Sequence, residues 1–184
     1  MGFTIRNAHL IDAATDIARG EIVIDGGSIQ AVRDAGNAAG NEDDRGSVID
    51  ATGMIVMPGF IDVHTHGGGG FSLHTTDVTE IHSYAHWAPT TGVTSFLIAV
   101  VGVPGTMPDG QLETAVLAIE GQGGRRTGAE PLGIHLEGPY ISAARRGAHP
   151  ASWLRMPDEE ETKRLLALAN GYLRLLTIAP ELPG

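Results

Sequence analysis

Residues 57–66 read MPGFIDVHTH, an apolar segment that ends in two histidines separated by one residue. The run PGFIDV is typical of a buried strand, and side chains two positions apart on a strand point to the same face. His64 and His66 therefore project together from the end of this strand. Two imidazoles that converge in this way suit a divalent metal ion, with zinc the best match, whereas the simpler interpretation is a pair of exposed loop histidines.

Strand and helix patterns alternate after this segment, which is the signature of βα units on a parallel sheet. The expected strands are 58–63, 93–101, 131–137 and 172–180, and the expected helices are 76–88, 109–121 and 158–171. We expect Thr75 or Thr76 to cap the first helix, and Asp109 and Asp158 to cap the others. A (β/α)8 barrel has eight strands in about 250 residues. The four predicted strands correspond to the first half of such a barrel.

The residues before this region have a different pattern. Residues 1–56 contain short runs of alternating apolar and polar residues between Gly and Asp turns, and residues 34–47 form a polar loop. We predict an α/β fold with two domains: a small, incomplete β-sandwich-like domain at 1–56 and the N-terminal half of a (β/α)8 barrel at 57–184.

The stretch GIHLEGPY at 133–140 provides a second candidate ligand. Glu137 ends the predicted third strand, and the carboxyl ends of barrel strands are where active sites lie. Its carboxylate could therefore bind the same metal as the two histidines, although a solvated acid at a strand end is common. His135 lies on the same face and deeper, either as a hydrogen-bonded interior histidine or as a support for the metal site. The glycines at 67–70 would let the backbone turn sharply and approach a ligand closely.

Composition excludes several functional classes. The chain has 184 residues and a net charge of −10, so it lacks the basic density that nucleic-acid binding requires. It has no cysteine, which excludes disulfides and thiolate chemistry. We see neither an apolar run long enough to span a membrane nor a secretory signal, and a cytoplasmic location fits these features.

Several of these motifs carry a family resemblance. PGFIDVHTH resembles the entry motif of the amidohydrolase superfamily of metal-dependent hydrolases. HLEGPYISAARRGAHP at 135–150 resembles, more specifically, the N-acetylglucosamine-6-phosphate deacetylases, and TIAPE at 177–181 resembles a further strand of that family. Residues 1–56 also resemble its small β-domain. The resemblance covers the whole chain but only the first half of the family's length.

The resemblance implies roles for five residues. Glu137 would ligate the catalytic metal, and His64 and His66 would ligate a second metal in members that bind two. His149, in the triplet GAH, would contact the sugar, whereas its simpler interpretation is a loop histidine. Gly138 and the loop after it would line the substrate pocket. The implied cofactor is a divalent metal, best matched by zinc, with one or two ions in each complete enzyme.

The implied reaction is hydrolysis of a linear amide, which converts N-acetylglucosamine 6-phosphate into glucosamine 6-phosphate and acetate. The metal would lower the pKa of a water molecule to about 7 and polarise the amide carbonyl, and a carboxylate base would move the proton. The family's aspartate base and two further histidine ligands come from later strands, beyond residue 184. We therefore expect this chain to be an incomplete, inactive part of an enzyme that is a homo-oligomer, a dimer, when complete.

Two other functions remain open on the sequence alone. PGFIDVHTH would also suit another amidohydrolase, such as a dihydroorotase- or hydantoinase-like enzyme. The chain could instead be a non-catalytic truncated protein that binds a sugar phosphate or depends on a partner.

Other polar and aromatic residues carry weaker signals. Arg145 and Arg146 could attract a phosphate, but a solvated pair is the usual case. His82 and His86 have helical spacing that can bind metal, although such pairs are more often surface residues. Trp153 is most simply a packing residue. Asp62 shares a face with His64 and is most simply a core-lining acid satisfied by hydrogen bonds.

Overall fold

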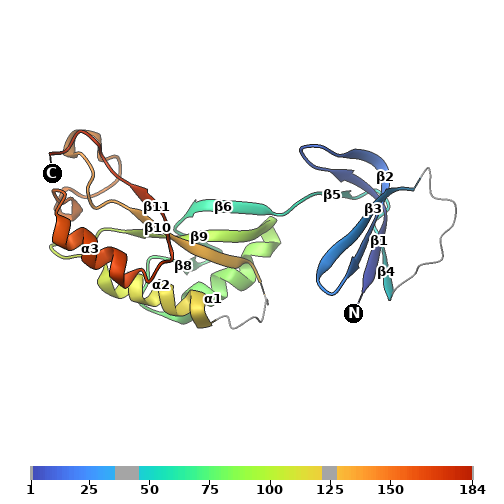
Figure 1. Cartoon of the computed structure of the whole chain (residues 1–184), viewed down its shortest axis with the longest axis horizontal. Coiled ribbons are helices and arrows are strands. Elements are labelled where there is room, and N and C mark those ends of the chain that lie inside the picture. Colours follow the sequence, from blue (N-terminus) through green and yellow to red (C-terminus); the bar gives the residue numbers. More distant parts are fainter. Residues whose placement is uncertain (1, 36–45, 122–127, 184) are drawn as a thin grey trace. The chain divides into compact units, whose positions relative to one another are not determined.

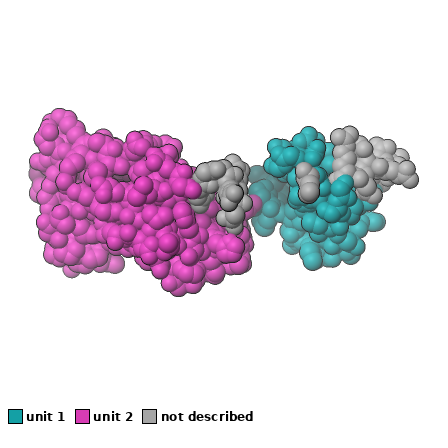
Figure 2. Space-filling model, turned by 90° about the horizontal axis from the view of Figure 1, so that it is seen from below, with its two compact units in different colours: residues 1–58 teal, residues 59–184 magenta. Residues whose placement is uncertain are grey.

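The computed structural model describes residues 2–35, 46–121 and 128–183. These residues form two compact units, Met1–Pro58 and Gly59–Gly184 (Figure 2). Most of the polar loop expected at 34–47 lies outside the described residues.

The first unit is a mixed sheet with strand order β3-β2-β1-β4, in which β5 also pairs with β1. Its strands are β1 (Phe3–Ile11), β2 (Asp16–Asp25), β3 (Ser28–Asp34), β4 (Ser47–Asp50) and β5 (Ile55–Val56). The pairs β1–β2 and β2–β3 are antiparallel, whereas β4 and β5 run parallel to β1. Side chains alternate between the two faces of each strand. Ala8, Leu10 and Ile22 are buried in this way and form a small cluster with Ala51.

The second unit contains a curled parallel sheet of order β11-β10-β9-β6, with helices on one side (Figure 1). The strands are β6 (Phe60–Thr65), β9 (Val93–Val101), β10 (Glu130–Glu137) and β11 (Leu173–Thr177). The helices are α1 (Val78–Trp87), α2 (Asp109–Gly121) and α3 (Glu159–Leu168). A short hairpin, β7 (Gly67–Gly68) and β8 (Phe71–Ser72), follows β6, and short 3-10 helices lie at Ala88–Thr91, Ala143–Arg145 and Ala151–Trp153. This half-barrel confirms the predicted α/β class and its four strands and three helices.

The main core lies between the parallel sheet and its helices. Phe96, Ile98 and Val100 alternate along β9 toward the helices, and all three are fully buried. Phe96 packs edge-on against Tyr84 of α1, with 4.9 Å between the ring centroids. Because neighbouring side chains on a strand alternate, the residues between them face the opposite, concave side of the sheet.

The outer strand β6 of this sheet carries exposed apolar side chains. Ile61 and Val63 on β6 are 62% and 54% exposed. Within the described residues, β6 pairs only with β9 and β11 only with β10, so both outer strands keep a free edge. A free edge next to exposed apolar side chains favours association with another polypeptide.

The helix starts test the capping predictions. The prediction of Thr75 or Thr76 as the cap of α1 is wrong: Asp77 is the cap, and its Oδ1 accepts from the Thr79 backbone N at 2.8 Å. The Thr75 hydroxyl is used instead to accept from the Asp77 backbone N at 3.0 Å. Asp109 lies inside the first turn of α2 rather than before it, and it pairs with Arg164 at 2.9 Å.

The predicted cap of α3 is confirmed and can be tested directly. Asp158 accepts from the Glu161 backbone N at 2.8 Å. We expect Asp158→Ala to lower the free energy of unfolding by about 1 kcal/mol because one N–H at the helix start loses its partner. Asp158→Asn keeps a capping oxygen and should lose much less. Urea unfolding of the three proteins measures this, and equal midpoints for the wild type and Asp158→Ala would contradict it.

Candidate metal centre and substrate pocket

Three strand-end side chains meet on the concave side of the half-barrel. His64 lies near the end of β6, His66 follows that strand, and Glu137 is the last residue of β10. The His66 Nε2 is 3.2 Å and the His64 Nε2 is 3.7 Å from Glu137 Oε2. The three potential ligand atoms lie within 4.8 Å of one another, and no second group of this kind occurs among the described residues.

The small side chain of Ala99 lies on β9 at the level where His64 approaches His135. β9 lies between β6 and β10 in the sheet, and Ala99 is the β9 residue paired with His135. Ala99 is fully buried and is not part of the helix-side core. A methyl group fills little space, and the His64 and His135 rings approach each other across β9, with centroids 4.7 Å apart.

The donor chemistry of the cluster fits a divalent metal ion. Two imidazole nitrogens and one carboxylate oxygen are a ligand set that zinc accepts, and three protein ligands leave a coordination position for water or substrate. The Glu137 side chain is 21% exposed, whereas the two histidines are about half exposed. The cluster is therefore open to an ion and to a small molecule from the concave side.

His149 contacts the other oxygen of the same carboxylate. Its Nε2 is 3.3 Å from Glu137 Oε1, and its side chain is only 14% exposed. Gly138 begins the loop that returns His149 to Glu137, and its φ of +82° is one that residues with a side chain rarely adopt. The backbone N of Gly138 donates to the Thr177 carbonyl at 3.1 Å, which ties this turn to β11.

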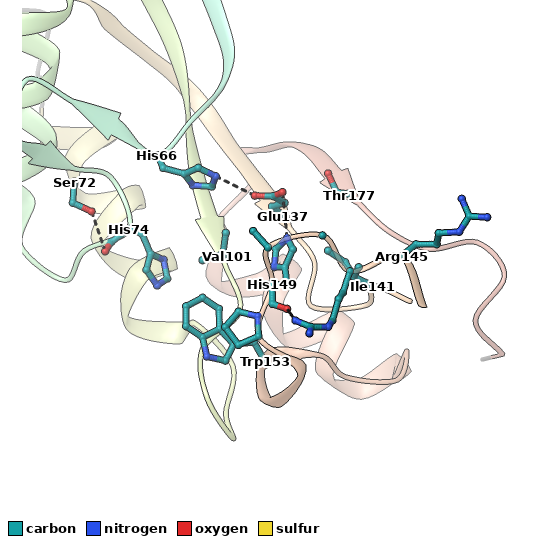
Figure 3. Close-up of a pocket in the computed structure, with 14 residues that line it drawn as sticks. His66, Ser72, His74, Val101, Glu137, Ile141, Arg145, His149, Trp153 and Thr177 are labelled. Carbon is teal, nitrogen blue, oxygen red and sulfur yellow. Dashed lines mark hydrogen bonds and ion pairs between the residues drawn. The ribbon is translucent and has the colours of Figure 1, made fainter. Parts of the chain in front are cut away.

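A cavity of about 660 Å³ opens beside Glu137 (Figure 3). Its lining includes His66, Glu137 and His149, and the two basic residues Arg145 and Arg146. The remaining lining residues are Ser72, His74, Val101, Ile141, Gly147, Ala148, Pro150, Trp153 and Thr177. The structure thus brings residues with predicted metal and sugar roles into one cavity, while His64 lies beside it in the cluster.

One wall of this cavity was not predicted as part of the site. His74 stacks on Trp153, with centroids 6.4 Å apart and an interplanar angle of 29°. His74 Nδ1 is buried without a hydrogen-bond partner among the described residues. Trp153 therefore packs, as expected, but it also borders the cavity. Neither residue lies in a motif that suggests this pairing, and the contact joins a loop residue, His74, to the distant 3-10 helix Ala151–Trp153.

Burial of His74 predicts a pH effect on stability. Burial, with a smaller contribution from nearby His66, lowers the pKa of His74 below its usual 6.5. The unfolded chain therefore binds a proton that the folded chain resists, and stability falls as the pH drops below about 6.5. We expect His74→Phe, which keeps a ring against Trp153, to show a shallower decline between pH 7.5 and 5.5. Urea midpoints across this range measure it, and identical slopes would contradict it.

His135 is more buried than the proposed ligands. It is 5% exposed, and burial is the largest of several influences that together lower its pKa. Its Nε2 is 2.8 Å from Thr177 Oγ1, and its Nδ1 is 3.2 Å from the Val63 carbonyl oxygen. His135 is thus a hydrogen-bonded interior histidine in contact with His64.

The other polar candidates have local roles. Asp62 Oδ1 accepts from the His64 backbone N at 3.1 Å. His82 donates through Nε2 to the Ala118 carbonyl oxygen at 3.3 Å if that nitrogen carries the proton. Neither His82 nor His86 belongs to the metal-compatible group found among the described residues.

The glycine run after His66 has a packing role. A Cβ at Gly69 would lie 2.4 Å from the ring of Trp87, so this close approach is to a tryptophan. This contact does not test the expectation that these glycines approach a ligand, because it is made with Trp87. Their turn is the β7–β8 hairpin.

Comparison with known proteins defines the class of protein. The profile described as "Amidohydrolase family" matches residues 55–183, and the chain therefore belongs to this family. Within it, the chain is similar to N-acetylglucosamine-6-phosphate deacetylases. It is 36% identical to the enzyme of Bacillus subtilis over 131 residues, which are 69% of this chain and 32% of that protein. It is 41% identical to the human protein of that name over 138 residues, covering 72% and 33%.

A solved structure supports the fold over the whole chain. The N-acetylglucosamine-6-phosphate deacetylase of Pasteurella multocida superposes with a TM-score of 0.84 and 23% identity, covering 100% of this chain and 46% of that one. The aligned residues therefore span about a third of the length of the two curated relatives and less than half of the Pasteurella multocida chain. Separately, among the described residues, no helix is long and apolar enough to cross a membrane. These matches confirm the resemblance that the sequence motifs indicated.

Proposed function

We propose that residues 1–184 provide the N-terminal, metal-binding half of an enzyme that hydrolyses N-acetylglucosamine 6-phosphate to glucosamine 6-phosphate and acetate. The observation that carries this proposal is the convergence of His64, His66 and Glu137, within motifs that resemble those of the deacetylases. In this proposal residues 1–56 are the small β-domain and residues 57–184 the first half of the barrel. Two further statements are predictions from the sequence: that the protein is cytoplasmic, and that the complete enzyme is a homodimer.

Each residue of the cluster has a defined task. Glu137, His64 and His66 would hold one or two divalent ions, of which zinc suits the donor set best. Such an ion would lower the pKa of water to about 7 and polarise the amide carbonyl. His149, held against Glu137, contacts the sugar from the facing loop. Gly138 is not itself among the residues that line the cavity, but it turns the chain into the loop that carries lining residues such as Ile141 and His149.

Two further features of the cavity suit a sugar phosphate. Arg145 and Arg146 line it on the side of the His149 loop, and a guanidinium pairs well with phosphate oxygens. Arg146 also donates to the His149 carbonyl oxygen, so this loop has an internal support. The cavity is large enough for a monosaccharide phosphate within the usual range of ligand sites.

The described residues do not provide an evident general base. The Glu137 carboxylate contacts three histidines, and Asp62 accepts a hydrogen bond from the His64 backbone N. A base that takes a proton from water must lie within hydrogen-bond reach of it and be free to do so. We propose that the base and the remaining ligands come from the barrel half that the relatives have in addition.

A chimera tests the proposed reaction. Residues 1–184 would replace the corresponding N-terminal part of the Bacillus subtilis relative, and acetate release would be measured after zinc loading. We expect hydrolysis of N-acetylglucosamine 6-phosphate, and no turnover of dihydroorotate or hydantoin. N-acetylgalactosamine 6-phosphate and unphosphorylated N-acetylglucosamine would show how much the 4-hydroxyl and the phosphate contribute. A folded, zinc-loaded chimera that cleaves a cyclic amide instead would support the alternative amidohydrolase.

The exposed edge of β6 favours a second possibility, a partner-dependent protein. Ile61 and Val63 would be covered if another polypeptide docked on this edge. Sedimentation of the purified chain distinguishes the cases, because a monodisperse monomer that unfolds cooperatively would argue against a need for a partner.

A further inference from the structure

His135 contacts three groups, and one of them, His64, belongs to the proposed metal site. Its Nδ1 lies 3.1 Å from His64 Nδ1 and 3.2 Å from the Val63 carbonyl oxygen, and its Nε2 lies 2.8 Å from Thr177 Oγ1. Thr177 is at the exposed end of β11, whereas His135 is almost fully buried. The chain Thr177–His135–His64 therefore runs from β11 through β10 to β6.

The three distances allow two arrangements of the ring protons. A neutral imidazole carries a proton on one nitrogen and accepts at the other. In the first arrangement, His135 Nδ1–H points to the Val63 carbonyl oxygen and to the unprotonated Nδ1 of His64, and the Thr177 hydroxyl donates to His135 Nε2. Since a carbonyl oxygen only accepts, this arrangement satisfies Val63, and it leaves the proton of His64 on Nε2.

A metal ion in the cluster requires the second arrangement. His64 faces Glu137 through Nε2, so it would ligate through that nitrogen and must carry its proton on Nδ1. Within the described contacts of that Nδ1, the acceptor in reach is His135 Nδ1. His135 must then be protonated on Nε2 and donate to Thr177 Oγ1. Metal-binding histidines are generally oriented in this way, by an acceptor for the other ring N–H.

We propose that His135 is a positioning residue for His64, and that its ring changes tautomer when the cluster binds zinc. The proposal rests on the metal site of the proposed function. The protons balance: His135 passes its Nδ1 proton to His64 Nδ1, and the Nε2 proton of His64 goes to water. His135 Nε2 takes a proton from the Thr177 hydroxyl, which regains one from water. Each ring is neutral before and after the exchange, and water takes up one proton and returns one.

The tautomers can be observed in the whole 184-residue protein. Long-range proton–nitrogen NMR of the histidine rings distinguishes a protonated Nδ1 from a protonated Nε2. We expect His135 to carry its proton on Nδ1 without metal and on Nε2 with saturating Zn²⁺. Retention of the Nδ1 proton by His135 in the zinc-bound protein would overturn the proposal, although the metal site itself would stand.

Zinc affinity provides the second readout, measured by competition with a chromophoric chelator. Thr177→Val removes the hydroxyl with little change in shape, and we expect about 10-fold weaker binding, at the lower end of the effect of such supporting residues. His135→Leu should weaken binding by up to about 100-fold. His135→Asn should restore most of it, because the amide oxygen can take the place of the ring Nδ1. Thr94→Val is the matched control, since Thr94 is an exposed strand threonine outside the cluster.

The outcomes separate this proposal from the proposed function. If the wild type binds zinc, His64→Ala abolishes binding, and Thr177→Val and His135→Leu bind like the wild type, the positioning role is wrong and the metal site is right. If the wild type binds zinc no more tightly than His64→Ala does, the proposed metal site is wrong, and the proposed role of His135 is wrong as well. Thr177→Val keeps the test informative if His135→Leu fails to fold.

Discussion

Glu137→Gln should weaken zinc binding by more than about 100-fold, beyond the effect of losing a supporting residue. Glu137 Oε2 is the atom that the Nε2 atoms of both His64 and His66 approach, at 3.7 and 3.2 Å. It is also the carboxylate of the metal-compatible group found in the described part of the chain. Glutamine keeps the shape but removes the negative charge, so a dication would meet two neutral imidazoles and an amide.

The measurement is a zinc affinity at pH 7 by chelator competition, with the metal content of the dialysed protein as a check. Glu113→Gln is the matched control, because Glu113 is an exposed acid on α2 that is not part of the cluster. Its affinity should equal that of the wild type. Equal affinities for Glu137→Gln and the wild type would show that zinc, if bound, is held elsewhere.

The zinc-loaded 184-residue chain should not release acetate from N-acetylglucosamine 6-phosphate above about 10⁻³ s⁻¹, compared with a median enzyme turnover of about 10 s⁻¹. The reason is that the described residues offer no evident free base: Glu137 contacts His64, His66 and His149, and Asp62 accepts from a backbone N–H. The open concave face also leaves water in contact with the cluster, which weakens electrostatic stabilisation of a transition state.

The full-length Bacillus subtilis relative is the positive control for this assay. Binding of the substrate to the 184-residue chain, followed by NMR, would show whether the cavity recognises the sugar phosphate without turning it over. Turnover near ordinary enzyme rates that is lost in Glu137→Gln would contradict the prediction. It would mean that a base lies within these residues.

Much of the second unit was predictable because its pattern is local. The expected strand at 93–101 and helix at 109–121 match β9 and α2 residue for residue. Their boundaries follow from runs of apolar residues and from short polar connections, which depend on neighbours in the sequence. The wrong cap of α1 shows the limit of this approach, since Thr75, Thr76 and Asp77 all offer a capping oxygen and only the backbone path selects one.

The sequence by itself determined that His64 and His66 share a face, and that Glu137 ends a strand of the same parallel sheet. These conclusions need only the alternation of a strand and the common direction of parallel strands. Family motifs then suggested a role for each residue.

Only the tertiary structure decided which side chains touch. The His149–Glu137 contact, the stacking of His74 on Trp153 and the approach of His135 to His64 join segments far apart in the chain. The His135–His64 approach crosses β9 where that strand carries the small Ala99, and the His149–Glu137 contact depends on the path of the loop after Gly138. Spacing along the sequence sets the direction of a side chain, but the distance between two strands' side chains is set by how the sheet bends and packs.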